Sequence, residues 1–179
     1  LSVFDSEVKI HTKCRSATSH YRLLLTHLET LIQDTTKQKG TSTAKALHQL
    51  ADSINRRSMV VIFSDMFDNS EDPNSLFAAL QHLKYAKHEV ILFHVTDKKH
   101  EIDFDFENRP YLFVDMETGE EVKLQQNQVK ELYTERVRKF NEDLKLKCLQ
   151  YKIDYVEADI NDGFDVVLQK YLVKRNKMK

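Results

Sequence analysis

The sequence predicts an α/β protein in which a mostly parallel sheet carries helices on both faces. Two apolar runs, Ser58–Asp65 and Glu89–Val95, have the length and continuous apolarity of strands that are buried on both faces. Between them, Asp72-Pro73 is a helix start signal, an N-cap followed by proline. A strand, a helix and a second strand at this distance predict a right-handed βαβ unit with parallel strands.

A hairpin and two helices are expected before the first of these strands. Leu1–Phe4 and Val8–His11 flank a short polar turn, as the strands of a hairpin do. A helical pattern begins at Thr18 or Ser19 and ends before Gly40. Its apolar face is formed by Tyr21, Leu24, Leu25, Leu28, Leu31 and Ile32. A second helix carries Leu47, Leu50, Ala51 and Ile54 on one side.

After the second buried strand the simple alternation of strands and helices is interrupted. Pro110–Asp115 and Glu121–Leu124 flank a glycine-containing turn and predict an inserted β-hairpin. A long helix follows from about Gln126 to Tyr151, and Ile153–Val156 is the third candidate for a parallel strand. The buried stripe expected for the long helix consists of Val129, Leu132, Tyr133, Val137, Phe140 and Leu144. The last helix is expected to turn Phe164, Val167, Leu168, Tyr171 and Leu172 inward, and the basic residues 174–179 to form a solvated tail.

Composition restricts the class of protein. The 179 residues suit one domain with a sizeable core, spanning residues 1–179. The formal net charge of -1 argues against a general binder of nucleic acid or of anionic membranes. Cys14 and Cys148 lack metal-ligand spacing and are interpreted as reduced thiols of a cytoplasmic protein, with a single disulfide between them as the alternative. No apolar run is long enough to span a bilayer. Because Leu1-Ser-Val-Phe4 resembles the inside of a strand, we expect a fragment of a longer protein.

The most informative polar group is Asp65 together with the hydroxyl cluster Thr41-Ser42-Thr43. A carboxylate and hydroxyls that meet at the carboxyl edge of a sheet suit Mg²⁺, which prefers oxygen ligands and keeps several waters. The alternative is structural: Thr41 or Ser42 caps a helix, and Asp65 caps the loop after its strand. The residue types alone leave both interpretations open.

Asp65 also permits an enzymatic hypothesis. A carboxylate after a buried strand is where aspartyl-phosphate chemistry takes place in phosphohydrolases and receiver domains. Phosphohydrolases place a second acid two residues later, whereas here Asp68 is three residues later. The sequence contains neither a G-x-G-x-x-G motif nor a P-loop. His94, inside an apolar strand, is interpreted as a core histidine, and Cys148 as inert packing.

Three segments resemble von Willebrand factor type A (VWA) domains. Leu1–Val8 resembles their "G-L-V-x-F-x-D-x-V" hairpin, Gly40-Thr41-Ser42 their G-T-[DN] loop, and Ile62–Asp65 their strand ending in S-D. The chain is more specifically similar to a bacterial family of unknown function whose VWA-like domains occur beside MoxR-type AAA+ ATPases. The further matches to that family are Lys87–Asp97, Glu101–Glu107 and Asp115–Glu120.

The resemblance implies a Rossmann-like VWA fold and a non-enzymatic interaction domain that acts with an AAA+ ATPase in assembly or maturation of protein complexes. It implies a metal-ion-dependent adhesion site to which Thr41 and Asp65 contribute. The D-x-S-x-S motif of that site is absent, and Ser42 replaces the usual acidic or amide residue. Mg²⁺ binding by this chain is therefore expected to be weak or undetectable.

The strand that carries the missing D-x-S-x-S motif is expected to be absent as well. In VWA domains the strand that bears D-x-S-x-S lies between the strands matched by Leu1–Phe4 and Ser58–Asp65. Either these two strands pair directly, or an open edge remains. Because an unpaired edge is a template for another chain, a homodimer through this edge is the expected outcome of an open gap.

Overall fold

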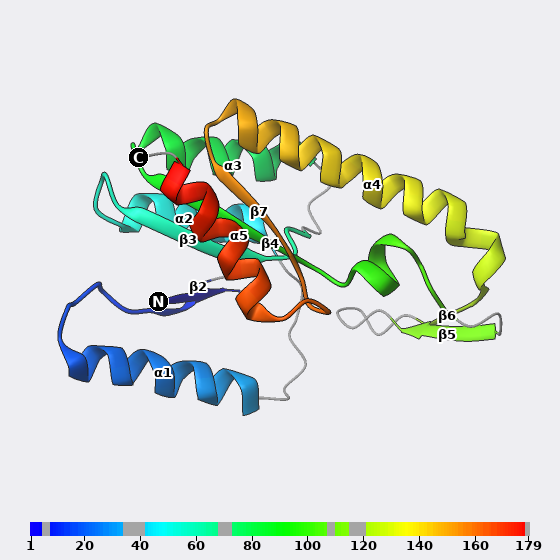
Figure 1. Cartoon of the computed structure of the whole chain (residues 1–179), viewed down its shortest axis with the longest axis horizontal. Helices are drawn as coiled ribbons and strands as arrows, with labels where there is room; N and C mark the ends of the chain where they lie inside the picture. Colours follow the sequence, from blue (N-terminus) through cyan, green and yellow to red (C-terminus); the bar gives the residue numbers. More distant parts are fainter. Residues whose placement is uncertain (5–7, 34–41, 68–72, 107–109, 115–120, 178–179) are drawn as a thin grey trace.

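The computed structural model describes residues 1–4, 8–33, 42–67, 73–106, 110–114 and 121–177 (Figure 1). The helices are α1 (Thr18–Gln33), α2 (Thr43–Ser53), α3 (Pro73–Tyr85), the π-helix η1 (Lys98–Ile102), α4 (Gln126–Gln150) and α5 (Phe164–Lys177). The strands are β1 (Ser2–Phe4), β2 (Val8–His11), β3 (Met59–Ser64), β4 (Glu89–Thr96), β5 (Pro110–Val114), β6 (Glu121–Gln125) and β7 (Asp154–Asp159).

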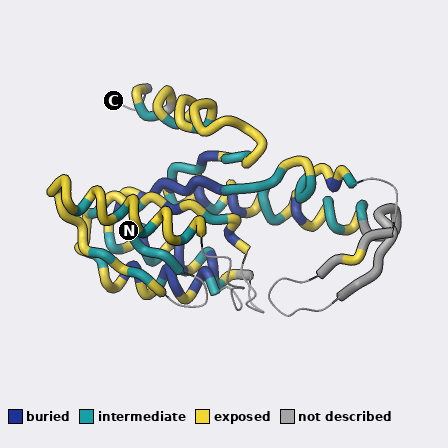
Figure 2. Tube along the Cα trace, turned by 90° about the horizontal axis from the view of Figure 1, so that it is seen from below, coloured by how far each residue is buried: buried dark blue, intermediate teal, exposed yellow. Residues whose placement is uncertain are grey.

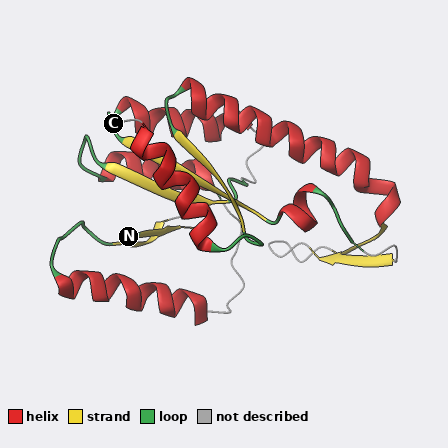
Figure 3. Cartoon of the chain, viewed as in Figure 1, coloured by secondary structure: helices red, strands yellow, loops and turns green. Residues whose placement is uncertain are grey.

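The main sheet has the order β3-β4-β7, and both pairings are parallel. Met59 pairs with Glu89 and Ser64 with His94, so β3 and β4 are aligned over the whole length of β3. The predicted parallel βαβ unit, β3-α3-β4, is therefore confirmed. Figure 3 shows the three strands between α5 on one side and the helices α2, α3 and α4 on the other.

Two apolar clusters hold the layers together. The larger one lies between the sheet and the helices α2, α3 and α4, and includes Leu47, Leu80, Leu92 and Leu144. The smaller one, on the opposite face, joins Ile91, Phe93 and Val156 to Val167 and Tyr171 of α5. Helices therefore cover both faces of the sheet, which confirms the predicted fold class.

The expectation that Ser58–Asp65 is buried on both faces is wrong. Ile62 is buried, but Met59, Val61 and Phe63 on the opposite face are 57%, 41% and 66% exposed. The reason is the sheet order: β3 lies at an edge, whereas β4 is central and is buried on both faces from Val90 to His94. Continuous apolarity therefore predicts burial on both faces correctly for β4 but not for β3, which has one exposed face.

Several helical faces predicted to be apolar and buried are exposed. In α1 no residue is buried, and Tyr21, Leu25, Leu28 and Ile32 are exposed. In α5 only Val167 and Tyr171 pack against the sheet, whereas Phe164, Leu168 and Leu172 are exposed. In α4, Val137 and Leu144 are buried as expected, but Leu132 is exposed. Figure 2 shows α5, beside the C-terminus, as largely exposed.

The remaining expectations concern the hairpin and the C-terminal end. β5 and β6 form the predicted inserted hairpin, antiparallel with Pro110 opposite Gln125. Residues 174–177 belong to α5 and are not a frayed tail: the Arg175 guanidinium lies 2.9 Å from Glu89 and donates to the Tyr171 hydroxyl at 2.6 Å. Among the described helices, none has the length and apolarity needed to cross a membrane.

β1 and β2 form a separate two-stranded sheet. β1 does not pair with β3, so the gap between them is not closed by direct pairing. A groove of about 1060 Å³ lies in this gap and is lined by residues of both strands.

Candidate functional site at the carboxyl edge of the sheet

The carboxyl ends of the three parallel strands meet at one edge of the sheet. Asp65 follows β3, Asp97 follows β4, and Asp159 ends β7. The register pairs Ser64 with His94 and Thr96 with Asp159, so these ends are staggered along a single edge. This is the edge at which ligands bind in open α/β sheets.

The Asp65 side chain caps the loop that follows β3. Its Oδ1 accepts a hydrogen bond from the Phe67 N–H at 3.1 Å and lies 3.5 Å from the Ser64 hydroxyl. The Ser64 Oγ in turn accepts from the Met66 N–H at 2.9 Å, and Met66, fully buried, has a φ of 59°. The Asp65 side chain is itself exposed, and no described residue donates to its Oδ2. The structural interpretation of Asp65 as a loop cap therefore holds, and the residue is at the same time exposed.

Thr43 joins the beginning of α2 to the same loop. Its hydroxyl, completely buried, donates to the Phe67 carbonyl at 2.8 Å. Ser42 occupies the N-cap position of α2, but its side chain makes no capping hydrogen bond, so of the two candidate caps, Thr41 and Ser42, the cap by Ser42 is not formed. The helix instead begins with the Ser42 carbonyl accepting from the Ala46 N–H at 3.1 Å. Thr41 lies outside the described residues, and its place beside Asp65 stays a prediction.

The His94 side chain of β4 holds the Asp65 backbone through a hydrogen bond to its carbonyl oxygen. The ring is buried, with Nε2 3.0 Å from the Asp65 carbonyl oxygen and Nδ1 2.9 Å from the Tyr155 hydroxyl. Burial lowers the pKa of His94 below its ordinary value, which favours the neutral ring. The interpretation of His94 as a hydrogen-bonded core histidine is thus supported, and its position gives it a role in shaping the edge.

A hydrogen-bonded network at Asp97 was not predicted from the sequence. The Asn161 amide donates to Asp97 Oδ1 at 2.9 Å and to Asp159 Oδ1 at 2.8 Å. His100 Nδ1 lies 2.6 Å from Asp97 Oδ2. The hydrogen bonds from His100 and Asn161 hold the pKa of Asp97 at about 2. The only sequence signal was position, since Asp97 and Asn161 both follow predicted strands.

The network also affects Glu101. Its carboxylate accepts from the Asp97 N–H at 3.0 Å. Burial raises the pKa of Glu101, and the nearby charges of Asp65, Asp97 and Asp159 raise it further. Four carboxyl groups, those of Asp65, Asp97, Glu101 and Asp159, therefore contribute to the electrostatics of one edge, and each accepts at least one hydrogen bond from a neighbouring backbone N–H.

The described residues do not assemble a complete metal site. Within the ranges that the structure describes, no group of three or more His, Cys, Asp or Glu side chains is arranged to hold a metal ion. The exposed carboxylate that the described part of the edge offers Mg²⁺ is that of Asp65, whereas Mg²⁺ sites use near-octahedral oxygen ligands. Thr41, the second ligand that the resemblance implies, lies outside the described residues.

Comparison with protein families identifies the chain. A family model described as "Protein of unknown function DUF58" matches residues 1–143. The chain belongs to this family. The DUF58 match includes Asp65, His94 and Asp97, but β7 and α5 follow it, although β7 supplies the third strand of the sheet and Tyr155. No curated protein and no solved structure matches the chain.

Proposed function

We propose that this DUF58 chain is a protein-interaction domain of the VWA type and not an enzyme. Its partner in this proposal is a MoxR-type AAA+ ATPase, and the pair acts in assembly or maturation of other protein complexes. Membership of DUF58 is consistent with the proposal, and the motif resemblance to VWA-like domains that occur beside such ATPases supplies the kind of partner.

The observation that carries the proposal is the way Asp65 is presented. Its carboxylate is exposed, while its loop is held by Phe67, by the buried Thr43 hydroxyl and by His94. Positioning the group in advance reduces the ordering cost of binding. A fixed and exposed carboxylate suits recognition of a partner's cationic group, or of a cation shared with a partner.

The Mg²⁺ part of the proposal follows from the ligand count. Asp65 supplies one oxygen, and Thr41 is the proposed second ligand. Two protein ligands are too few for tight binding unless a partner's oxygen atoms complete the site. Calorimetric titration of the isolated chain should therefore detect weak binding or none, and a sub-millimolar dissociation constant would contradict this arrangement.

The partner is tested with a matched pair of variants. Asp65→Asn removes the charge of the site at nearly constant size, whereas Asp143→Asn makes the same change at an exposed position of α4. Binding to the MoxR-type ATPase, measured by biolayer interferometry in the presence of Mg²⁺ and ATP, should weaken at least about tenfold in Asp65→Asn, or about 1.4 kcal/mol. Equal binding by wild type and Asp65→Asn would remove Asp65 from the interface.

The alternative is a phosphotransfer or phosphohydrolase-like enzyme in which Asp65 is the nucleophile. Its exposed position after β3 is the feature that this alternative shares with the interaction proposal. Turnover of para-nitrophenyl phosphate with Mg²⁺ separates the two. Release of phosphate by wild type and Asp143→Asn, with loss in Asp65→Asn, would favour the enzyme. We expect no turnover by any of the three proteins.

A further inference from the structure

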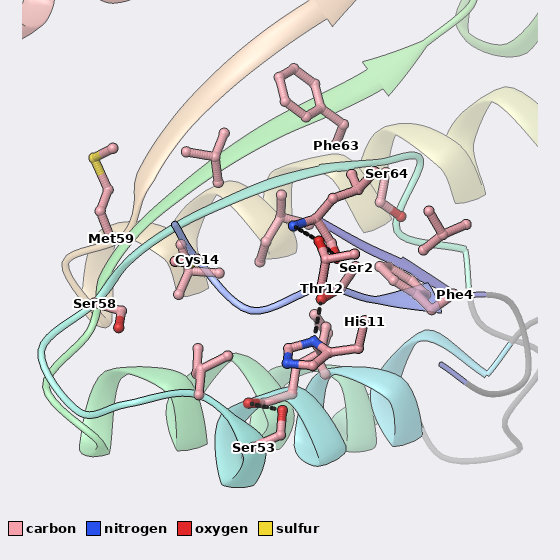
Figure 4. Close-up of a pocket in the computed structure, with 18 of the residues that line it drawn as sticks. Ser2, Phe4, His11, Thr12, Cys14, Ser53, Ser58, Met59, Phe63 and Ser64 are labelled. Atoms are coloured by element: carbon pink, nitrogen blue, oxygen red, sulfur yellow. Dashed lines mark hydrogen bonds between the residues drawn. The ribbon is translucent and has the colours of Figure 1, made fainter. Parts of the chain in front are cut away.

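Two histidines from different helices meet between α2 and α3. His48 belongs to α2 and His82 to α3, and Figure 4 shows these helices side by side below β3, with Ser53 in the last turn of α2. The two Nδ1 atoms lie 3.0 Å apart. The ring centroids are separated by 5.2 Å, and the ring planes are inclined by 42°. The fold thus brings two imidazole nitrogens together from positions 34 residues apart in the sequence.

The hydrophobic core fixes the backbone that carries this pair. Leu47 directly precedes His48, Leu83 directly follows His82, and both leucines are buried in the larger apolar cluster. The histidine rings themselves are only partly buried, and the His82 side chain is 34% exposed. A preorganised pair binds a ligand at a lower ordering cost than side chains that must first be fixed. The pair is therefore held in place and is accessible from solvent.

Asp52 determines which nitrogen of His82 carries the hydrogen. Its Oδ1 lies 3.5 Å from His82 Nε2, and Asp52 follows His48 by one turn of α2. A carboxylate only accepts, so the hydrogen of the neutral His82 ring lies on Nε2, and Nδ1 keeps its lone pair. His48 Nδ1 then donates to His82 Nδ1. When the His48 hydrogen moves to the Nε2 of the same ring, both Nδ1 atoms carry a lone pair and can bind a metal ion.

The separation of the two nitrogens fits adjacent positions around a metal ion. Imidazole nitrogens bind Zn²⁺, Cu²⁺ and Ni²⁺, with metal–nitrogen bonds of about 2.0–2.1 Å in zinc sites. Two such bonds place the nitrogens about 2.9 Å apart at a right angle and about 3.4 Å apart at a tetrahedral angle. The observed distance of 3.0 Å lies within this interval. A small rotation of each ring turns its lone pair from the other ring towards an ion that both rings share.

Asp52 also occupies the place of a supporting carboxylate. A histidine that binds a metal usually donates its other ring N–H to a carboxylate, a carbonyl or water, which orients the ring. With His82 Nδ1 directed towards His48, the other nitrogen of His82 is the one that lies near Asp52. The negative charge of Asp52 beside the pair further favours a bound cation. A pair of rings joined by a hydrogen bond alone does not require this carboxylate.

We propose that His48 and His82 bind a divalent transition-metal ion between α2 and α3, and that Asp52 positions His82. Each histidine contributes its Nδ1 atom. With two ligands from this pair, water occupies other positions around the ion, and binding is weaker than in a closed structural zinc site. The bound ion joins two helices that cover the same face of the sheet. The inference does not depend on the proposed function of Asp65 or on the identity of an ATPase.

The site is tested by titrating Zn²⁺ in a calorimeter into the Cys14→Ser chain, which lacks the exposed thiol. Saturable binding of one ion per chain is expected. Loss of a supporting residue typically weakens metal binding about 10–100-fold, so loss of a ligand in His48→Gln or His82→Gln should weaken it at least about tenfold. The matched control is His27→Gln, which removes a histidine of α1 and should bind Zn²⁺ as the Cys14→Ser chain does.

The positioning role of Asp52 is tested by Asp52→Asn, which keeps both ligands. Zn²⁺ affinity should fall at least about tenfold. The urea midpoint measured with EDTA should stay unchanged, since the Asp52 side chain is 76% exposed. A structural role alone would move the midpoint and not the affinity. Zn²⁺ should raise the urea midpoint of the Cys14→Ser chain but not that of His48→Gln or His82→Gln in the same background, because binding to the folded state stabilises it.

A spectroscopic measurement needs no change at the site itself. Pulsed electron paramagnetic resonance of the Cys14→Ser chain loaded with Cu²⁺ counts the imidazole nitrogens coupled to the ion, and two imidazoles are expected. Coupling to one imidazole or to none would overturn the proposal. Equal Zn²⁺ affinity of His48→Gln, His82→Gln and the Cys14→Ser chain would place the ion elsewhere. Absence of saturable binding would leave the pair as a hydrogen-bonded contact between two helices.

Discussion

His94 Nε2 lies 3.0 Å from the backbone carbonyl oxygen of Asp65, so a buried side chain of β4 holds the end of β3. A carbonyl oxygen only accepts, and Nε2 must therefore carry the hydrogen. In the neutral ring Nδ1 then accepts from the Tyr155 hydroxyl of β7 at 2.9 Å. One histidine thus connects all three parallel strands at the edge where the candidate site lies.

His94→Phe should lower the free energy of unfolding by about 2 kcal/mol, because the Asp65 carbonyl and the Tyr155 hydroxyl would lose their buried partner. Tyr155→Phe removes one of the two hydrogen bonds and should cost about 1 kcal/mol. Urea denaturation of the three proteins measures both losses. If His94→Phe is as stable as wild type, the two hydrogen bonds do not support the edge.

Stability should decrease as the pH falls below about 6.5. Burial lowers the pKa of His94 in the folded state from its ordinary value of 6.5, so the unfolded chain binds the proton more readily. The stabilisation is complete above pH 6.5 and is lost as the pH falls towards the lowered pKa. His88, whose pKa is lowered mainly by burial, acts in the same direction. The urea midpoint, measured at pH 5, 6, 7 and 8, should therefore change less with pH in His94→Phe than in wild type, and His88 contributes to the change that remains.

The Asp97 carboxylate should titrate near pH 2. Hydrogen bonds from His100 and then Asn161 favour its charged form. Because its pKa is depressed, Asp97 contributes stability above its ordinary pKa of 3.8, and this is lost as the pH falls towards 2. His100→Ala and Asn161→Ala should each raise the pKa, the first more than the second. Carbon-detected NMR titration of the carboxyl group checks the order.

The local parts of the fold could be predicted from the sequence because they depend on periodicity and on local signals. Pro73 begins α3, and the helical pattern from Thr18 becomes α1. The inserted hairpin β5–β6 follows from its turn residues. The sheet order is a tertiary property, and an apolar run does not reveal it. For that reason the burial of β4 was predicted correctly and that of β3 was not.

The candidate site shows the same division. Asp65 could be placed at a strand end because the S-D pair follows an apolar run. The hydrogen-bonded network of Asp97 could not be predicted. Asn161 is 64 residues away along the chain, and it reaches Asp97 only because β4 and β7 are neighbours in the sheet. The exposure of the apolar face of α1 could not be predicted either. An amphipathic pattern predicts an apolar face, but it does not show what packs against that face.

The two cysteines should differ in reactivity. Cys14 is exposed, whereas Cys148 is completely buried in α4 and burial raises its pKa to about 12. Since the thiolate is the reactive form, a disulfide-exchange reagent should modify one thiol in the native protein and two in denaturant. Cys14→Ser should leave no fast-reacting thiol. Rapid modification of two thiols in the native protein would show that α4 does not shield Cys148.

Leu144 and Leu149, both in α4, allow a test of the main core on a single helix. Leu144 is 0% exposed within the larger cluster, whereas Leu149 is 76% exposed. Leu144→Ala leaves a cavity beneath α4 and should cost about 2–5 kcal/mol of unfolding free energy. Leu149→Ala makes the same chemical change at the surface and should stay within about 0.5 kcal/mol of wild type. Thermal and urea unfolding measure both. Similar losses in the two variants would mean that the long helix does not pack on the sheet along the face that carries Leu144.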